Sequence, residues 1–126
     1  MNRFTHFELA AKDLEKTAEF YRDIFGWGFE KWSGPVEYWM VTTGDRNTPG
    51  INGGLMQTGG DFTGTINTIE VDDIDGVLAR VLAHGGSVAM EKEPIPGVGY
   101  QAYFRDVSGI MVGLHQADDS AGQPAD

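Results

Sequence analysis

His6 and Glu8 are the residues near the start of the chain whose types and spacing could do chemistry. They lie two positions apart in RFTHFELAA (3–11), a run that alternates well enough to be a strand, so their side chains point to the same face. An imidazole and a carboxylate on one face can act as an acid–base pair or provide two ligands for a metal ion. His6 can equally be a buried histidine that a neighbouring hydroxyl or carboxylate satisfies, or a polar contact for a ligand.

His115 is a second candidate and lies near the end of GIMVGLHQ (109–116). In a strand it shares a face with Gly113, so it could contact a ligand or, together with the first pair and Glu70, build a displaced site. The alternative is a residue at the rim of a terminal strand. His84 precedes two glycines at the end of a predicted helix, where the helix dipole favours a cation, and we expect it to be structural.

The elements that must position these residues are predicted to repeat along the chain. Asp13 and Gly26 bound one helix, and Asp73 and Gly86, each sixty residues further on, bound another. The apolar residues at helical spacing are Leu14, Ala18, Tyr21, Ile24 and Phe25 in the first helix and Ile74, Val77, Leu78, Val81 and Leu82 in the second. Strands are predicted at 3–11, 27–32, 37–43 and 50–57, and again at 65–71, 87–91, 99–106 and 109–116. Both halves are therefore predicted as β-α-β-β-β, and an internal repeat sets the architecture.

Two runs, GINGGLMQ (50–57) and GIMVGLHQ (109–116), agree at five of eight positions, and we call them the twin runs. Gly54 and Gly113 occupy the same place in each. An isolated glycine in a strand costs stability and marks a close approach by another group. If side chains alternate, both glycines face away from the helices, and we expect them to leave open volume for a ligand.

Aromatic and methionine side chains on the inner strands are candidate ligand contacts. The predicted set is Tyr38, Met40, Met56 and Tyr103, together with Gly54, Gly113 and His115. These residues can also be ordinary core, and a slip of one residue in the alternation would reverse the faces.

The composition excludes several classes of function. Nine basic against nineteen acidic residues give a net charge of -10, so neither nucleic acid nor a membrane is expected as a partner. The acidic surplus is either solvated surface or a groove for a cationic ligand, for which the candidates are Glu30, Glu37, Glu91 and Glu93.

The chain has no cysteine, which excludes disulfides and thiol nucleophiles. It also shows no leader or membrane-spanning run, so we expect a soluble, cytoplasmic protein with a flexible acidic tail at 117–126.

Two β-α-β-β-β modules with HFEL at the start, AEFYRDIFGW and VDDIDGVLARVLAHGGSV on the helices, and YFRDVSGIMVGLHQ at the end resemble the vicinal oxygen chelate superfamily. This is the group of glyoxalases, bleomycin resistance proteins and extradiol dioxygenases. The resemblance implies one α+β domain over 1–116, made of modules at 3–58 and 64–116, whose open barrel-like sheet bears a ligand cleft. It also implies a homodimer. The rival, a ferredoxin-like domain, would place two strands after the first helix where three are predicted.

The resemblance further implies metal ligands on the first and last strand of each module. These positions fall on His6, Gly54, Ile66 and Gly113. Only His6 can coordinate through its side chain, whereas a catalytic zinc takes about three protein ligands. No cofactor is therefore expected, and a divalent metal remains possible only at a rearranged site.

Two functions of different class follow. The first is a metal-independent protein that binds a small organic molecule, with His6 and Glu8 as polar anchors. The second is an enzyme, a lyase or isomerase of glyoxalase type or a dioxygenase-type protein, that uses a rearranged metal site or His6 with Glu8 as an acid–base pair.

Overall fold

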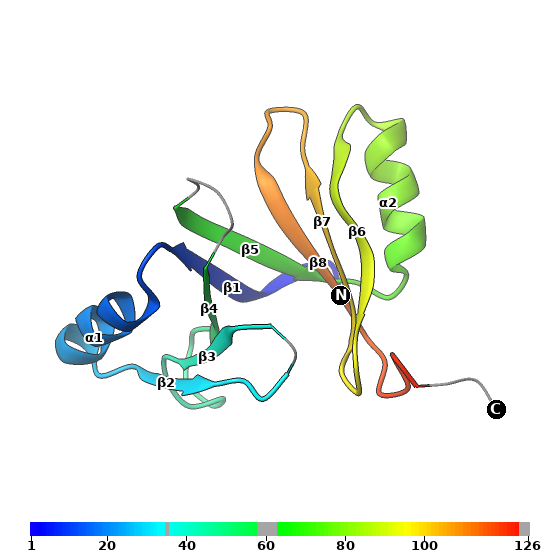
Figure 1. Ribbon diagram of the computed structural model, residues 1–126. Helices are drawn as coiled ribbons and strands as arrows, with labels where there is room; N and C mark the ends of the chain where they lie inside the picture. The colour runs from blue at the N-terminus through cyan, green and yellow to red at the C-terminus, as the bar shows by residue number, and fades with distance from the viewer. Residues whose placement is uncertain (35, 58–62, 124–126) are drawn as a thin grey trace. The chain divides into compact units, whose positions relative to one another are not determined.

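The computed structural model describes residues 1–34, 36–57 and 63–123. The elements are β1 (Arg3–Ala11), α1 (Leu14–Phe25), β2 (Gly28–Lys31), β3 (Tyr38–Thr42), β4 (Gly53–Gln57), β5 (Gly64–Glu70), α2 (Ile74–Ala83), β6 (Ser87–Ile95), β7 (Gly99–Arg105) and β8 (Met111–Ala117) (Figure 1). The α+β class and the two tandem β-α-β-β-β modules are therefore confirmed. Within the described ranges, neither helix is long and apolar enough to cross a membrane.

The first helix begins and ends where the sequence predicts. The Asp13 side chain accepts a hydrogen bond from the backbone N–H of Lys16 at 3.0 Å and so satisfies one of the free donors of the first turn. Gly26 follows the last turn with φ of +73°, and its N–H donates to the carbonyl of Arg22. A glycine suits this left-handed cap because it has no Cβ to clash.

The second helix is capped in the same way at its start and differently at its end. Asp73 accepts from the backbone N–H of Gly76 at 3.1 Å. His84 is the C-cap residue, and its ring Nδ1 donates to the carbonyl of Arg80 at 2.8 Å. The structural role predicted for His84 at the helix end is consistent with this bond.

The chain divides into two compact units. We call Thr5–Asn67 the first unit, and Met1–Phe4 with Thr68–Asp126 the second unit. The second unit therefore takes in the start of β1, and the backbone N–H of Asn2 donates to the carbonyl of Glu70 at 2.7 Å. The domain boundaries, and the barrel-like sheet with its cleft, stay predictions.

In the first unit the strand order is β2-β3-β4-β1, with β4 and β1 parallel and the other neighbours antiparallel. Leu55 lies opposite Trp39 on one side and Leu9 on the other, so these three side chains share a face. The core on this face consists of Leu14, Ala18, Trp39, Val41 and Leu55. Since Leu14 and Ala18 belong to α1, the helix covers this face and the opposite face carries the candidate site residues.

In the second unit β8, β7 and β6 follow one another as antiparallel neighbours, and α2 runs along β6 (Figure 1). Its core consists of Val71, Ile74, Leu78, Ala102 and Leu114. Leu55 and Leu114, which match in the twin runs, are 0% and 1% exposed. The predicted inward position of these two leucines is confirmed, whereas Ile51 and Ile110, expected on the same faces, are 39% and 60% exposed.

Some apolar positions predicted on the inner helix faces are exposed. Ile24 is 56% exposed, Phe25 is 60% exposed and Leu82 is 57% exposed. The physical reason is visible for Phe25, whose ring packs against that of Trp27 at 5.7 Å in a cluster at the end of α1 rather than against the sheet.

The strands of the twin runs begin later than predicted. Gly50 has φ of +138° and Gly109 has φ of +84°, conformations that interrupt an extended strand. The regular strand therefore starts only at Gly53 in β4 and at Met111 in β8.

The glutamines that match at the end of the twin runs tie each last strand to the segment where the helix starts. The Gln57 amide donates to the carbonyl of Lys12 at 3.0 Å. The Gln116 side-chain carbonyl accepts from the backbone N–H of Ile74 at 2.8 Å. Their agreement in sequence therefore has a structural cause, since both satisfy backbone groups near a helix N-terminus.

The segment predicted as a tail makes ordered contacts at its start. Residue 117 still belongs to β8. Asp118 N–H donates to the carbonyl of Val98, and Gly97 N–H donates to the carbonyl of Ala121, both at 3.0 Å. Because Ala121 is 0% exposed, the prediction that the flexible tail begins at residue 117 is wrong. The flexibility of its end stays a prediction, and 124–126 lie outside the described residues.

Candidate functional site

His6 is paired with a tyrosine that comes from another strand of the first unit. Its Nε2 lies 2.7 Å from the Tyr38 hydroxyl, and the two rings are nearly parallel, at 13°. Either the hydroxyl donates to Nε2 or, in the other tautomer, Nε2–H donates to the hydroxyl oxygen. Of the interpretations left open for His6, a histidine satisfied by a neighbouring hydroxyl describes this geometry.

Tyr38 also explains the glycine of the first twin run. A Cβ on Gly54 would overlap the hydroxyl and ring of Tyr38. Tyr38 lies opposite Met56 in the register, so its ring leans along the sheet to cover Gly54. The expectation that Gly54 leaves open volume is wrong, because the tyrosine ring fills that volume.

Glu8 lies in the same row of the sheet. In the register it faces Gly54, which faces Met40 on its other side, so these positions share one face. Glu8 is only 4% exposed, whereas Met40 is 42% exposed. The predicted alternation therefore holds, and His6, Glu8, Tyr38, Met40 and Met56 lie on the face opposite α1.

In the second unit the matching glycine is covered by different residues. A Cβ on Gly113 would lie 2.7 Å from the Oγ1 of Thr68 and 3.3 Å from the ring of Tyr103. Tyr103 is opposite Gly113 in the register. The open volume expected at Gly113 is therefore also absent, because a threonine and a tyrosine occupy its surroundings.

The structure brings Glu70 and His115 together. The Nδ1 of His115 lies 2.7 Å from one oxygen of the Glu70 carboxylate and 2.8 Å from the other. The backbone beside them is also joined, since Val71 N–H donates to the carbonyl of His115 at 2.9 Å. The two side chains are 20% and 23% exposed, so the pair is largely shielded from water.

The positions of the implied metal ligands do not fit a metal ion. Nε2 of His6 is taken by Tyr38, and Ile66 is an apolar side chain that is 3% exposed. Gly54 and Gly113 offer no side chain. Within the described ranges, no group of three or more His, Asp or Glu residues could hold a metal ion.

The acidic residues that were candidates for a cation-binding groove lie at the surface. Glu30, Glu37, Glu91 and Glu93 are all exposed. Glu30 is opposite Met40 in the register. Solvated surface is the interpretation that this exposure favours.

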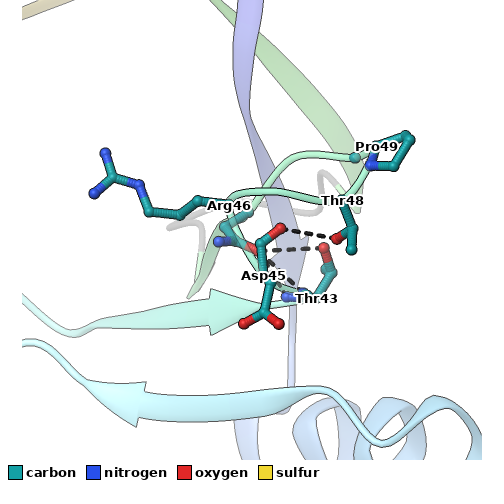
Figure 2. A pocket seen from close by; sticks show the side chains of 8 residues that line it. Thr43, Asp45, Arg46, Thr48 and Pro49 are labelled. Carbon is teal, nitrogen blue, oxygen red and sulfur yellow. Dashed lines mark hydrogen bonds between the residues drawn. The ribbon is translucent and has the colours of Figure 1, made fainter.

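A small pocket lies in the loop between β3 and β4 (Figure 2). Its volume is about 80 Å³ and it is lined by Thr43, Gly44, Asp45, Arg46, Thr48, Pro49, Gly50 and Asn52. The loop satisfies its own polar groups, since Thr43 N–H donates to the Asn52 side chain and the Thr48 hydroxyl donates to the Asp45 carbonyl. Figure 2 shows the Arg46 side chain extending away from Thr43 and Thr48. The pocket is small beside drug-sized sites of roughly 300 Å³ or more.

A second pocket of about 160 Å³ lies between β1, α1 and the start of β5. Its lining residues are Leu9, Ala10, Ala11, Thr17, Tyr21, Gly64 and Thr65. Neither lining includes a predicted site residue.

The sequence did not single out Thr68, which covers Gly113, and it placed Glu70 only in a hypothetical displaced site. The repeat could have identified Thr68, because it lies sixty residues after Glu8 and so holds the matching place in the second module. The ligand and catalytic roles of the predicted site residues stay predictions.

Solved structures define the class of this fold. A variant of the Streptomyces coelicolor methylmalonyl-CoA epimerase in complex with 2-nitronate-propionyl-CoA is 20% identical with a TM-score of 0.69, and the match covers 98% of this chain and 99% of that chain. The methylmalonyl-CoA epimerase from Mycobacterium tuberculosis is 16% identical with a TM-score of 0.67, covering 91% of this chain and 87% of that chain. At these identities the likeness shows a shared fold of the vicinal oxygen chelate type.

The sequence shows the family directly. Residues 3–114 match the Glyoxalase/Bleomycin resistance protein/Dioxygenase superfamily, and this chain belongs to it. A relative named "Putative glyoxylase CFP32" in Mycobacterium bovis and Mycobacterium tuberculosis is 29% identical over 127 residues, which cover 91% of this chain and 46% of the relative. The chain thus spans about half the length of these relatives, and the resemblance stated from the sequence is confirmed.

Proposed function

We propose that this chain binds a small organic molecule without a metal ion, on the face of the first unit that carries His6 and Tyr38. The observation that carries the proposal is the hydrogen bond of 2.7 Å between these two residues. This bond engages His6, the one residue at the four implied ligand positions whose side chain could coordinate a metal ion. The tyrosine ring fills the place above Gly54 where a second ligand would stand.

The surroundings of this pair suit an organic ligand. Trp32 lies edge-on to Tyr38, at 6.3 Å and 80°, and the exposed side chain of Met40 lies on the same face. Aromatic rings and a thioether offer apolar contact, while the imidazole and hydroxyl fix orientation. Met56, on the same face of the first unit, joins them in this proposal. Ligand contacts at Tyr103, Gly113 and His115 belong to the second unit and stay separate predictions.

Metal retention tests the first half of the proposal. The untagged protein is exposed to Zn²⁺, Ni²⁺, Mn²⁺ or Fe²⁺ and desalted, and the metal content per chain is measured. We expect far less than one ion per chain. Near-stoichiometric retention of one ion, lost in His6→Ala, would overturn the metal-independent site.

Fluorescence titration tests the second half. Trp32 reports on ligands near Tyr38, and the probes are methylmalonyl-coenzyme A, because two structural relatives carry that substrate in their names, and a set of small aromatic carboxylic acids. We expect a saturable change for at least one probe that is lost in Tyr38→Ala and kept in Phe20→Ala, whose side chain is exposed on α1. Equal titrations in all three proteins, or no saturable change in wild type, would contradict the proposal.

The alternative is a lyase or isomerase that uses His6 and Glu8 as an acid–base pair. The observation that favours it is the burial of the Glu8 carboxyl on the same face as His6, since buried titratable groups are typical of catalytic sites. Deuterium uptake into methylmalonyl-coenzyme A in heavy water is the test. Uptake that disappears in Glu8→Gln would favour the enzyme over the binding protein.

The cytoplasmic location, the homodimer, a bleomycin-resistance activity and a dioxygenase-type activity also stay predictions. A sedimentation experiment on the purified chain settles the oligomeric state. The match covers only 46% of the mycobacterial relatives, so each of those chains is long enough for a second domain of this size. The sedimentation experiment asks whether two copies of this chain associate instead.

A further inference from the structure

The pair Glu70 and His115 in the second unit is a polar cluster that the proposed binding function does not need. Nδ1 of His115 contacts both carboxylate oxygens, at 2.7 and 2.8 Å. Both residues belong to the second unit, so the cluster does not depend on His6 or Tyr38. A carboxylate held against Nδ1 fixes the ring orientation and the tautomer.

The geometry of the strands leaves the other ring nitrogen, Nε2, next to a glycine. A Cβ on Gly99 would lie 3.0 Å from Nε2, so the absence of a side chain lets the imidazole lie over that position. His115 is opposite Gln101 in the register, and the next pair on the same face is Gly113 with Tyr103. The His115 side chain is 23% exposed, so part of it is accessible to solvent.

This arrangement suits His115 for accepting a proton at Nε2. With Nδ1–H donated to the Glu70 carboxylate, the imidazole presents the Nε2 lone pair as a proton acceptor. When Nε2 takes a proton, the neighbouring carboxylate stabilises the imidazolium that forms. An imidazole that is oriented and partly shielded from water in this way meets the requirements of a general base.

We propose that His115 is a general base that removes a proton from carbon in a small planar carbon acid, and that Glu70 is the positioning residue that holds it. The Tyr103 ring on the same face suits a planar molecule, because aromatic rings stack on flat ligands. This activity goes beyond the proposed binding function and uses none of its residues in the first unit.

The probe reaction is the ring opening of 5-nitrobenzisoxazole. Nε2 takes the proton from the ring carbon, and the electron pair of that C–H bond forms the third bond of a nitrile. The N–O bond breaks, and its electron pair stays on oxygen as a coloured phenolate. The imidazolium then returns the proton to water, so no oxidant or other reactant is needed.

The experiment compares kcat/KM for this probe in wild type, His115→Gln, Glu70→Gln and the control His84→Gln. His115→Gln should lower the rate by about 100-fold or to the buffer rate, since general bases contribute roughly 10² to 10⁴. Glu70→Gln should lower it roughly tenfold, because an imidazole loses the partner that orients it. The control should match wild type, since the His84 ring bonds to its own helix.

A comparison of kcat with KM separates positioning from a general loss of structure. Loss of the carboxylate that orients the ring in Glu70→Gln should lower kcat and leave KM near the wild-type value, whereas partial unfolding lowers the amount of folded protein, which circular dichroism measures. Equal rates in wild type and His115→Gln, or a wild-type rate no higher than buffer, would overturn the proposal.

A second measurement covers the case in which the variants do not fold. Diethyl pyrocarbonate modifies imidazole nitrogens that are neutral and accessible, and mass spectrometry locates the modified residue in the wild-type chain. We expect modification at His115 as well as at the exposed His84. Modification at His84 with none at His115 would show that Nε2 is out of reach and would overturn the proposal.

Discussion

Gly54 and Gly113 hold matching places in the two units, yet different side chains cover them. In the first unit Tyr38 leans over Gly54 from the neighbouring strand and bonds to His6. In the second unit Gly113 lies against Thr68 and Tyr103. The same requirement for a glycine therefore arises from two unrelated packing arrangements.

The polar pairs of the two units differ in the same way. In the first unit the paired histidine is at the implied ligand position itself, His6. In the second unit that position holds Ile66, and the paired histidine, His115, lies two residues beyond Gly113 on β8. A repeated backbone thus carries two paired histidines at different levels along its strands, so a role proposed for one does not require a role for the other.

Removing the matched core leucines should have the largest effect. Leu55→Ala and Leu114→Ala each delete a side chain that is at most 1% exposed, and each should cost about 3 kcal/mol of unfolding free energy. Val107→Ala, at a residue that is 77% exposed, should change it by about 0.5 kcal/mol or less.

Urea denaturation measures the free energy of unfolding of both leucine variants and of the Val107→Ala control, and it also compares the two units. All three tryptophans lie in the first unit, so fluorescence follows that unit, while circular dichroism follows both. We expect the two signals to shift together. A Leu114→Ala protein whose circular dichroism shifts while its fluorescence does not would show that the units unfold separately.

The glycine substitutions should come next. Gly54→Ala forces Tyr38 aside and should cost about 2 kcal/mol, the usual range for overpacking. Tyr38→Ala should relieve that cost, whereas Thr68→Ala should relieve the cost of Gly113→Ala and leave Gly54→Ala unaffected. Double-mutant cycles in urea provide the measurement, and rescue in the crossed combinations would contradict the different packing found around the two glycines.

Loss of the bond between Tyr38 and His6 should have a smaller effect. Tyr38→Phe keeps the ring over Gly54 and removes only the hydroxyl, so it should cost about 1 kcal/mol. Nitrogen NMR of the His6 ring should show a changed Nε2 environment. The control is Tyr21→Phe, whose ring stacks on Trp27 at 5.0 Å and should keep that contact. An unchanged His6 signal in Tyr38→Phe would contradict the bond.

The smallest expected effect concerns the segment after β8 in the second unit. The Ser120 hydroxyl, and then its backbone N–H, donate to the Asp118 carboxylate and hold the pKa of that carboxyl below its usual 3.8. Because the pKa is lowered in the folded chain, the stabilisation is present above pH 3.8 and is lost as the pH falls through the folded value. Carbon NMR titration should show this pKa rising towards 3.8 in Ser120→Ala. The same pKa in both proteins would show that Ser120 is not its cause.

The order of elements and the inward faces could be predicted from the sequence because they depend on local and periodic signals. Asp13 and Asp73 start helices, and the twin runs place Leu55 and Leu114 inward. The repeat also placed His6 and Glu8 on the face opposite α1, since the period of a strand leaves only two choices.

The partners of the site residues could not be predicted, because they depend on how long side chains lean across strands. Tyr38 is opposite Met56 in the register but covers Gly54, a diagonal contact that alternation alone does not specify. The open volume inferred at Gly54 is wrong for this reason, whereas that at Gly113 is wrong because Thr68 and the directly opposite Tyr103 occupy its surroundings. The contacts of Ala121 were missed because small polar residues near a chain end are typical of a tail.

The bond between Asn2 and Glu70 joins the start of the chain to a strand that is synthesised much later. During translation the first four residues have no partner in their own unit until β5 has left the ribosome, and contacts between distant parts of a chain form slowly. A bulky fusion at the N-terminus would therefore delay the folding of the second unit, although it is attached to the first strand. A fusion after residue 123 would meet a segment that is already anchored to the turn at Gly97.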